Sequence, residues 1–484
     1  MKINQIFTIF ILLLAVINPI WAQQEIKFSS EAIEQDFEYL RSALEDAHYN
    51  LYAYTPKEVF NRHYKKTENS IKDSMTSLQA FRLFQPYVAL AKMSHCELGY
   101  PFNIYFGNYA AHGGIVFPLN ICFFQKKILI KNNYSNEANI PVGDELISLN
   151  RRPMTEVMND FYNFYSGESD YCINSNVDWI TFSRMYWFVF GQCDTFNLKI
   201  KKKNGSKVEL NVPAIPVYEF EDKIRNEPIM NYKREYKFFK EIAYVQPGPF
   251  MNVKYDGDNN PNMLDNTMYL HFLDSCFTEI HKRKSKYLIV DIRNNPGGVN
   301  SFSMPLISYF AAKSFSSNIK VIYKTSEVTK EGVKDLKDSL LSAEDIKLKN
   351  ELLSHKNGSY FEVKSNEVYL PKNDSVSFRG KVFVLINRFT YSQAIVAASL
   401  IQDYEFGTII GEPTPYAATM YASTQSFELP NTKIRVTYPR AFLQRKNKNS
   451  SLESLIPDFL IKENPISDKD EIMYNTIKLI DKMK

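Results

Sequence analysis

The amino-acid sequence predicts a mixed α/β protein, and three observations carry that prediction. Apolar residues recur at helical spacing between residues 29 and 91, for example at Phe37, Leu40 and Leu44. Short strands with turn signals follow between about residues 113 and 216. From about residue 244 onward, predicted strands alternate with helical stretches, which is typical of an α/β core.

The N-terminal sequence and the order of these predicted elements divide the chain into four segments. The apolar run 6–17, closed by a small residue at Ala22, is typical of a cleaved secretory signal, because a membrane span needs roughly 20 apolar residues. We expect a signal peptide at 1–22, a helical segment at 23–105, a β-rich module at 106–216 and an α/β core at 217–484. After cleavage we expect no membrane span, and export to the periplasm or out of the cell.

The core strands are expected at 269–272, 287–292, 321–323, 382–386 and 408–410, and a lysine- and glutamate-rich helical insertion at 326–360 is either a solvated surface element or a substrate gate. In the module, strands are expected at 115–124, 128–130 and 140–150, with a hairpin around Asn204-Gly205. Residues 98–105 are expected to be extended.

Composition excludes several kinds of function. A formal net charge of +4 is too weak to indicate nucleic acid or an anionic membrane as partner, and 44% hydrophobic residues suffice for packed cores. The cysteines lack CxxC spacing, so zinc is not expected; Cys172 and Cys193 form either one disulfide or, like the others, buried free thiols. The histidines are scattered and there is no HExxH or nucleotide loop, so no metal or other cofactor is expected.

Two strand-to-helix corners carry the candidate chemistry. The predicted strand 287–292 runs into Asn294-Asn-Pro-Gly-Gly298, where backbone N–H groups can be aimed at a reacting group. The predicted strand 382–386 leads to Tyr391-Ser392 and then to a helix-prone stretch, 393–401. Glycine amides and an exposed serine are parts for acyl transfer.

The order of motifs along the chain resembles the C-terminal processing peptidase and tricorn core protease family of serine peptidases, the tail-specific proteases. These motifs are Ser94-His95, 141–150, Asp291-Ile-Arg-Asn-Asn-Pro-Gly-Gly298, Tyr391-Ser-Gln-Ala394, Gly411-Glu-Pro-Thr414 and Ile456-Pro-Asp458. The resemblance implies a core like that of the Clp protease and crotonase folds, a PDZ-like module, and an exported serine peptidase acting on peptides or proteins.

The resemblance also implies site residues. In the family's lysine design, a lysine follows Gly411-Glu-Pro-Thr414 closely, whereas here the nearest is Lys433, inside an expected strand. The tricorn-like design uses a Ser-His pair at the position of Ser94-His95. A serine hydroxyl needs a base within reach, and histidine titrates near neutral pH, so Ser392 is the expected nucleophile and His95 the general base.

Further site residues complete this expectation. The amide of Gln393, with that of Gly297 or Gly298, is expected to form the oxyanion hole. Ser94 and Glu453 match the serine and late glutamate that orient the histidine in the tricorn-like pattern, although Glu453 lies closer to Pro457 than in the family and Leu455 replaces its usual glycine. Asp291 and Arg293 are expected to hold the corner together, and Cys96 to be a buried, inert thiol.

Alternatives remain open at this point. The module either takes a peptide tail by strand addition, with 117–120 as the candidate carboxylate loop, or is a spacer that positions the active site. The residues after Ser392 depart from the family pattern, which keeps a catalytically silent peptide- or lipid-binding protein on the same fold as the alternative function. A crotonase-type acyl-CoA enzyme is disfavoured by export, because coenzyme A is scarce outside the cell.

Overall fold

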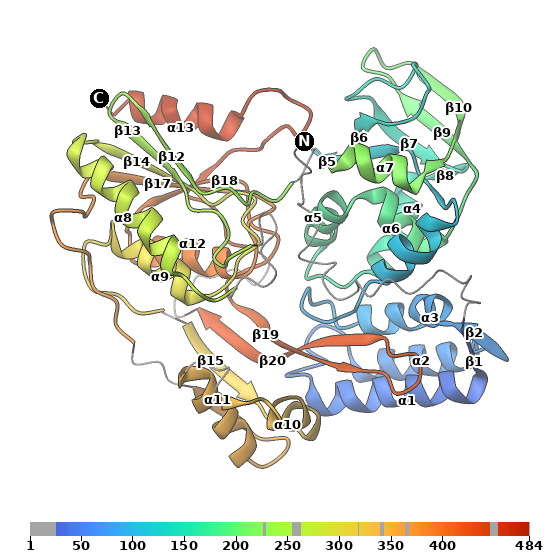
Figure 1. The fold of residues 1–484 in the computed structure, drawn as a ribbon. Coiled ribbons are helices and arrows are strands. Elements are labelled where there is room, and N and C mark those ends of the chain that lie inside the picture. The colour runs from blue at the N-terminus through green and yellow to red at the C-terminus, as the bar shows by residue number, and fades with distance from the viewer. Residues whose placement is uncertain are drawn as a thin grey trace.

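The computed structural model describes residues 26–225, 229–253, 263–317, 319–338, 343–363, 367–445 and 454–483. Figure 1 shows three parts: the N-terminal helices, the module with its own sheet, and the α/β core, which sends a long hairpin across to the N-terminal helices. The predicted signal peptide lies outside the described residues. The mixed α/β fold class predicted from the sequence is confirmed.

The N-terminal part is helical, as predicted, and side-chain caps explain where two of its helices begin. Its helices are α1 (Ser30–Ala47), α2 (Lys57–Glu68) and α3 (Ser77–Ala89), with β1 (Lys27–Ser29) and β2 (Ser74–Thr76) paired beside them. Ser29 caps α1, and Thr76 forms a reciprocal capping box with Gln79 on α3. Phe37, Phe84 and their neighbours stack in one aromatic core.

The module contains a sheet of order β10-β9-β7-β6-β5, with β8 attached to β7 and β5 at the edge. Its strands are β5 (Leu119–Phe124), β6 (Lys127–Asn133), β7 (Glu145–Leu149), β8 (Arg152–Pro153), β9 (Thr195–Lys201) and β10 (Lys207–Pro213), beside the small pair β4 (Ile115–Val116) and β11 (Ile215–Pro216). The hairpin around Asn204-Gly205 is confirmed as the antiparallel pair of β9 and β10.

Four helices in the module were not predicted: α4 (Met154–Phe164), α5 (Asp170–Ile180), α6 (Phe182–Phe190) and α7 (Val217–Ile224). Their aromatic side chains, such as Phe161 and Phe182, pack against the sheet. In the sequence these aromatic residues show no clear helical period, so the neighbouring strand signals determined the prediction. The predicted extended stretch 98–105 is also wrong beyond β3 (Glu97–Leu98), because a π-helix, η1 (Asn103–Tyr109), follows it.

The core is built on a sheet of order β12-β13-β14-β17-β18-β21, parallel except for β12. Its strands are β12 (Glu235–Phe239), β13 (Ile242–Gln246), β14 (Tyr287–Asp291), β17 (Lys381–Ile386), β18 (Thr408–Gly411) and β21 (Phe459–Leu460). The predicted strand 269–272 is wrong: it lies in α8 (Thr267–Lys282), where Tyr269 and Leu273 face the core at helical spacing.

Helices cover both faces of this sheet. Leu288 and Val290 on β14 pack on the side of α8, α9 (Asn300–Ser308) and α12 (Gln393–Asp403), whereas Tyr287 and Ile289 pack on the side of α13 (Glu471–Asp481). Side chains alternate between the faces of a strand, so a strand buried on both sides is apolar throughout.

A second sheet joins the core to the N-terminal part. It has the order β16-β15-β20-β19, from β15 (Ile319–Lys324), β16 (Tyr360–Val363), β19 (Met420–Glu428) and β20 (Arg435–Arg445), and β3 pairs with β20. The insertion contributes α10 (Glu327–Lys334) and α11 (Ala343–Ser354), and α10 packs against α1 and β19 with Thr329 buried. Lys433 lies in the turn between β19 and β20, not inside a strand as predicted.

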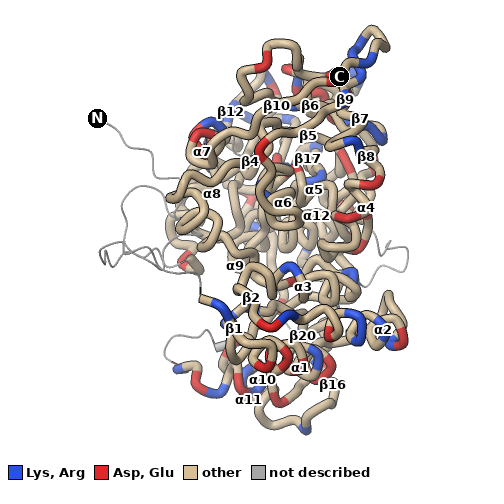
Figure 2. The backbone as a smooth tube through the Cα atoms, turned by 90° about the vertical axis from the view of Figure 1, so that its right-hand side faces the viewer, with Lys and Arg blue, Asp and Glu red and all other residues tan. Residues whose placement is uncertain are grey.

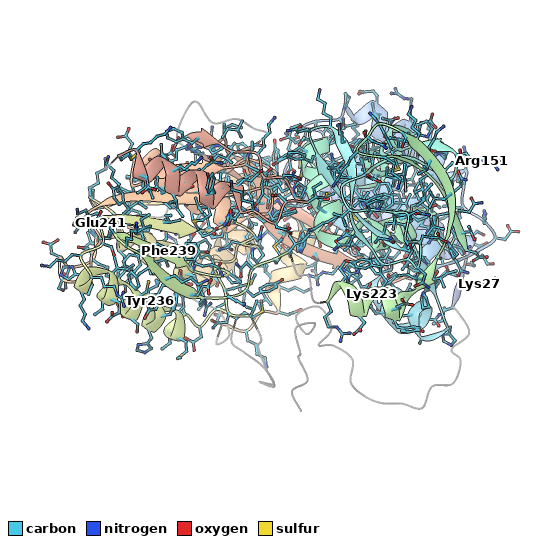
Figure 3. All side chains as sticks on the ribbon, turned by 90° about the horizontal axis from the view of Figure 1, so that it is seen from above. Lys27, Arg151, Lys223, Tyr236, Phe239 and Glu241 are labelled. Carbon is cyan, nitrogen blue, oxygen red and sulfur yellow. The ribbon has the colours of Figure 1, made fainter. Side chains whose placement is uncertain are left out.

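The surface carries both signs of charge in every part of the molecule, and Figure 2 shows lysine, arginine, aspartate and glutamate interspersed along the chain. Figure 3 places Tyr236, Phe239 and Glu241 at the outer side of the core, on and beside the edge strand β12. Among the described residues, no helix has the length and apolar character that a membrane crossing requires.

Candidate active site

Ser392 occupies a strained corner between β17 and α12. Its backbone angles are φ 49° and ψ −120°, a conformation that disfavours any residue with a Cβ. Such a residue costs about 1–3 kcal/mol of strain and persists only where the surroundings enforce it. A serine on a sharp strand-to-helix turn projects its hydroxyl away from the backbone, as a nucleophile must.

Gly297 lies directly against this corner. The two corners meet because β14 and β17 are neighbouring parallel strands whose carboxyl ends share one edge of the sheet. A Cβ at Gly297, where φ is +95°, would lie 2.8 Å from Ser392 Cβ and 2.8 Å from the Tyr391 carbonyl oxygen. Only glycine therefore permits this approach.

The amides expected to stabilise an oxyanion are at this junction. The amide of Gly297 donates to Asn295 Oδ1 (2.8 Å), so this donor is already used. Phe250 and Gly298 form a parallel β-bridge, in which the Phe250 amide donates to the Gly297 carbonyl and the Val299 amide donates to the Phe250 carbonyl. In this pattern the Gly298 N–H points away from Phe250. The Gln393 nitrogen is 2.9 Å from the position of a Gly297 Cβ, and it is one of the amides that a helix start leaves unpaired.

His95 lies beside the serine corner, with Tyr416 between them. The imidazole contacts the Tyr416 ring edge-on, with ring centroids 5.5 Å apart, and the Tyr416 hydroxyl accepts the Ser392 N–H (2.9 Å). Nδ1 of His95 is buried without a hydrogen-bond partner among the described residues. A neutral imidazole nitrogen in that state keeps a lone pair that can accept a proton.

Burial sets the acid–base character of His95. It lowers the pKa of the imidazole, while the negative charge of Glu168 and a hydrogen bond with the backbone of Tyr421 raise it, and the net shift is downward. The imidazole is therefore neutral at neutral pH, which is the form that a general base requires.

An acidic side chain not predicted from the sequence holds Ser94. The Ser94 hydroxyl donates to Glu168 Oε2, and the Ser94 amide donates to Glu168 Oε1 (3.1 Å). Cys172 Sγ is 3.0 Å from the same hydroxyl, and burial raises the pKa of this thiol. The predicted orienting residue Glu453 lies outside the described residues.

Part of the sequence matches the model of a known protein family. Residues 267–461, which include both corners, match the model described as peptidase family S41. The chain contains a peptidase family S41 domain. This confirms the predicted family resemblance and places the protein in the serine-type peptidase class.

Solved structures show the fold beyond the matched segment. Mature CPAF complexed with lactacystin is 12% identical with a TM-score of 0.64, and the match covers 94% of this chain and 97% of that one. A photosystem II D1 C-terminal processing protease is 13% identical over 89% and 93% of the two chains, with a TM-score of 0.41. The tricorn protease is 14% identical over 94% of this chain and 37% of that one, with a TM-score of 0.42. No curated protein matches the sequence.

In the S41 domain, a buried arginine fixes the serine corner. Arg388, four residues before Ser392, donates to both oxygens of Glu412 (3.0 Å each), to Asp178 on α5 (3.4 Å) and to the Phe123 carbonyl on β5 (2.7 Å). All three charged side chains are buried, where an unpaired charge would be strongly unfavourable. The motif Gly411-Glu-Pro-Thr414 thus has a structural role: it supplies the partner for Arg388.

The remaining predicted residues divide into confirmed and corrected ones. Asp291 and Arg293 pair at 2.7 Å beside β14, as expected for residues that hold the corner, and Cys96 is buried with a raised pKa. Of the two alternatives for Cys172 and Cys193, the disulfide is excluded and both thiols are free: Cys172 is buried beside Ser94, while Cys193 is partly buried and contacts Asn150 and the Thr195 carbonyl.

Gly297→Ala should lower the activity strongly while the protein still folds. The added methyl group displaces the Ser392 corner, and a displacement of about 1 Å at a reacting group can cost roughly 100-fold in rate. The matched control is Gly205→Ala in the β9–β10 turn, where φ is +87° and no atom lies within 4 Å of the new Cβ. Peptide cleavage by the two purified variants is the measurement; equal activities would contradict the close approach.

Ser392→Gly should be more stable than Ser392→Ala, although both lack the hydroxyl. Glycine adopts the Ser392 backbone conformation without strain, so the free energy of unfolding should be about 1 kcal/mol higher in the glycine variant. Exposed Ser42 within helix α1 is the control, because there glycine should be less stable than alanine by about 1 kcal/mol. Urea unfolding of the four variants tests this, and the same order of stability at both sites would refute the strain at Ser392.

Proposed function

We propose that the protein is an exported serine peptidase that hydrolyses peptide bonds of proteins or peptides through an acyl-enzyme on Ser392, with His95 as general base. One observation carries this proposal: within an S41 domain, Ser392 is held in a strained corner against Gly297 and the helix-start amide of Gln393. A structure that maintains backbone strain at a serine beside unpaired amides is suited to acyl transfer.

The proposed reaction assigns each proton. Ser392 Oγ attacks the carbonyl carbon of the scissile bond while His95 accepts the hydroxyl proton, and the oxyanion forms at the Gly298 and Gln393 amides. His95 then transfers its proton to the leaving amine, which departs and leaves an ester on Ser392. Water, deprotonated by His95, attacks this ester, and the serine regains its proton as the acid product leaves.

His95 must approach Ser392 for this reaction, and Tyr416 contacts both. The Tyr416 hydroxyl accepts a hydrogen bond from the Ser392 amide. Catalytic hydrogen bonds are commonly long in free enzymes and shorten in the substrate complex. Ser94 and Glu453 are the proposed orienting groups for the imidazole.

The module is proposed to position the active site instead of binding peptide tails. On its edge strand β5, the Phe123 carbonyl is bound by Arg388, and a peptide added as a strand would need such edge groups.

Ser392→Ala should abolish both labelling by a fluorophosphonate probe and cleavage of peptides, because the probe and the substrate react with the same hydroxyl. His95→Ala should lower turnover by several orders of magnitude, since nucleophile and base act as a unit. Lys433→Ala is the control; its amine is bound to the Pro430 carbonyl (2.7 Å) in the β19–β20 turn. Labelling that persists without Ser392 would refute the nucleophile, and a wild-type protein that never labels would indicate a catalytically silent binding protein.

The pH profile of kcat/KM tests the base. Proton abstraction needs neutral imidazole, and because burial lowers the pKa of His95, cleavage should rise with pH through a midpoint below about 6.5 and then level off. A lysine base would give a limb at more alkaline pH. Measurement at constant ionic strength on any accepted peptide suffices, and a midpoint above about 8 would count against His95.

A further inference from the structure

Glu168 is joined to the Ser94-His95 step by more than one hydrogen bond. Its two carboxylate oxygens accept from the amide and the hydroxyl of Ser94. Next to it, the Ser166 hydroxyl accepts from the Met93 amide (3.0 Å) and donates to the Met93 carbonyl (2.8 Å). Segments 93–94 and 166–168 are therefore bound side by side, immediately before the imidazole.

The carboxylate of Glu168 also faces the site. Burial raises the pKa values of Tyr416, Cys172 and Tyr54, to about 12 for Tyr54, and the negative charge of Glu168 adds to each of these shifts. Cys172 contacts the Ser94 hydroxyl and Tyr416 contacts the His95 ring, and with their raised pKa values all three groups stay neutral near neutral pH. Among the described residues, Glu168 is the charged side chain that acts on the pKa of His95.

We propose that Glu168 is a positioning residue for the general base: through Ser94 it fixes the backbone that carries His95, and its carboxylate stabilises the imidazolium formed when Ser392 loses its proton. This role rests on the proposed peptidase function. The role of Glu168 is independent of the role proposed for Glu453, and both carboxylates can act on His95.

The chemistry explains why a carboxylate suits this position. A buried imidazole resists protonation, since burial penalises its charged form, and a nearby negative charge offsets that penalty. The bonds from Ser94 use lone pairs of the carboxylate, so the charge itself is fixed in place. Cys172, 3.0 Å from the Ser94 hydroxyl, completes the packing as a neutral thiol.

The test compares Glu168→Gln and Glu168→Ala with the wild-type enzyme across a pH series. The glutamine variant keeps an acceptor for Ser94 but removes the charge, so the acidic limb of kcat/KM should move to lower pH, because the pKa of His95 falls further. On the plateau, kcat should fall roughly 10- to 100-fold, the value of a charge-assisted hydrogen bond, while KM stays nearly unchanged. The alanine variant should lose at least as much.

Asp36→Asn is the matched control. Asp36 likewise accepts a backbone amide and a hydroxyl, both from Thr432, but it is absent from the groups that act on the pKa of His95. It should leave the limb at its wild-type midpoint. Should Glu168→Ala fail to fold, the glutamine variant alone decides.

Three outcomes are separable. A shift of the acidic limb of kcat/KM to lower pH in Glu168→Gln, but not in Asp36→Asn, supports the proposal. If the acidic limb of kcat/KM in Glu168→Gln keeps the wild-type midpoint, with activity either retained or lowered equally at every pH, the proposal is overturned and the peptidase function stays intact. If the wild-type protein shows no Ser392-dependent cleavage, the proposed function is overturned instead. The charge coupling can then still be tested by an NMR titration of the histidines in Ser392→Ala, with and without Glu168→Gln. An unchanged pKa of His95 between these two proteins would overturn the coupling.

Discussion

The buried guanidinium of Arg388 is the interaction on which the active-site corner depends. Its partners come from three places in the chain: Glu412 after β18, Asp178 on α5, and the Phe123 carbonyl on β5. A buried ion pair is seldom a source of net stability, but leaving one member unpaired costs about 3–5 kcal/mol. Glu412 pairs this charge within the core, and Asp178 and the Phe123 carbonyl add two bonds from the module, so the docked module helps to hold the corner that presents Ser392.

The core was predictable where its signals are local. Strands β14, β17 and β18 are continuous apolar runs, as expected for parallel strands buried on both faces, and their polar ends identified both corners. That Gly297 meets Ser392 followed from the parallel order of neighbouring strands. The segment 269–272 was misread because aromatic residues favour strands, whereas its burial at helical spacing in α8 appears only over a longer window.

The site was predictable only in part, for the same reason. Ser94, His95 and Ser392 belong to short motifs that can be recognised in sequence. Glu168 belongs to none: it lies in a loop before α5, 74 residues from Ser94, and an acidic residue near a helix start is usually explained by the helix dipole. Its role depends on the pairing of two loops from different parts of the chain, which no local pattern encodes.

Helix α5 connects these two halves of the site. At its N-terminal end, Glu168 and Cys172 contact Ser94 on the side of the base. Further along, Asn176 accepts the Tyr391 hydroxyl (3.0 Å) and Asp178 pairs with Arg388, both on the side of the nucleophile.

Asp178 lies six residue steps after Cys172, which is about 9 Å of helix at a rise of roughly 1.5 Å per residue. Because this helix is bonded at both ends, it links the segment that carries His95 to the corner that carries Ser392. The module therefore connects the two halves of the candidate site, although neither Ser392 nor His95, the proposed nucleophile and base, belongs to it and the sequence of α5 carries no catalytic motif.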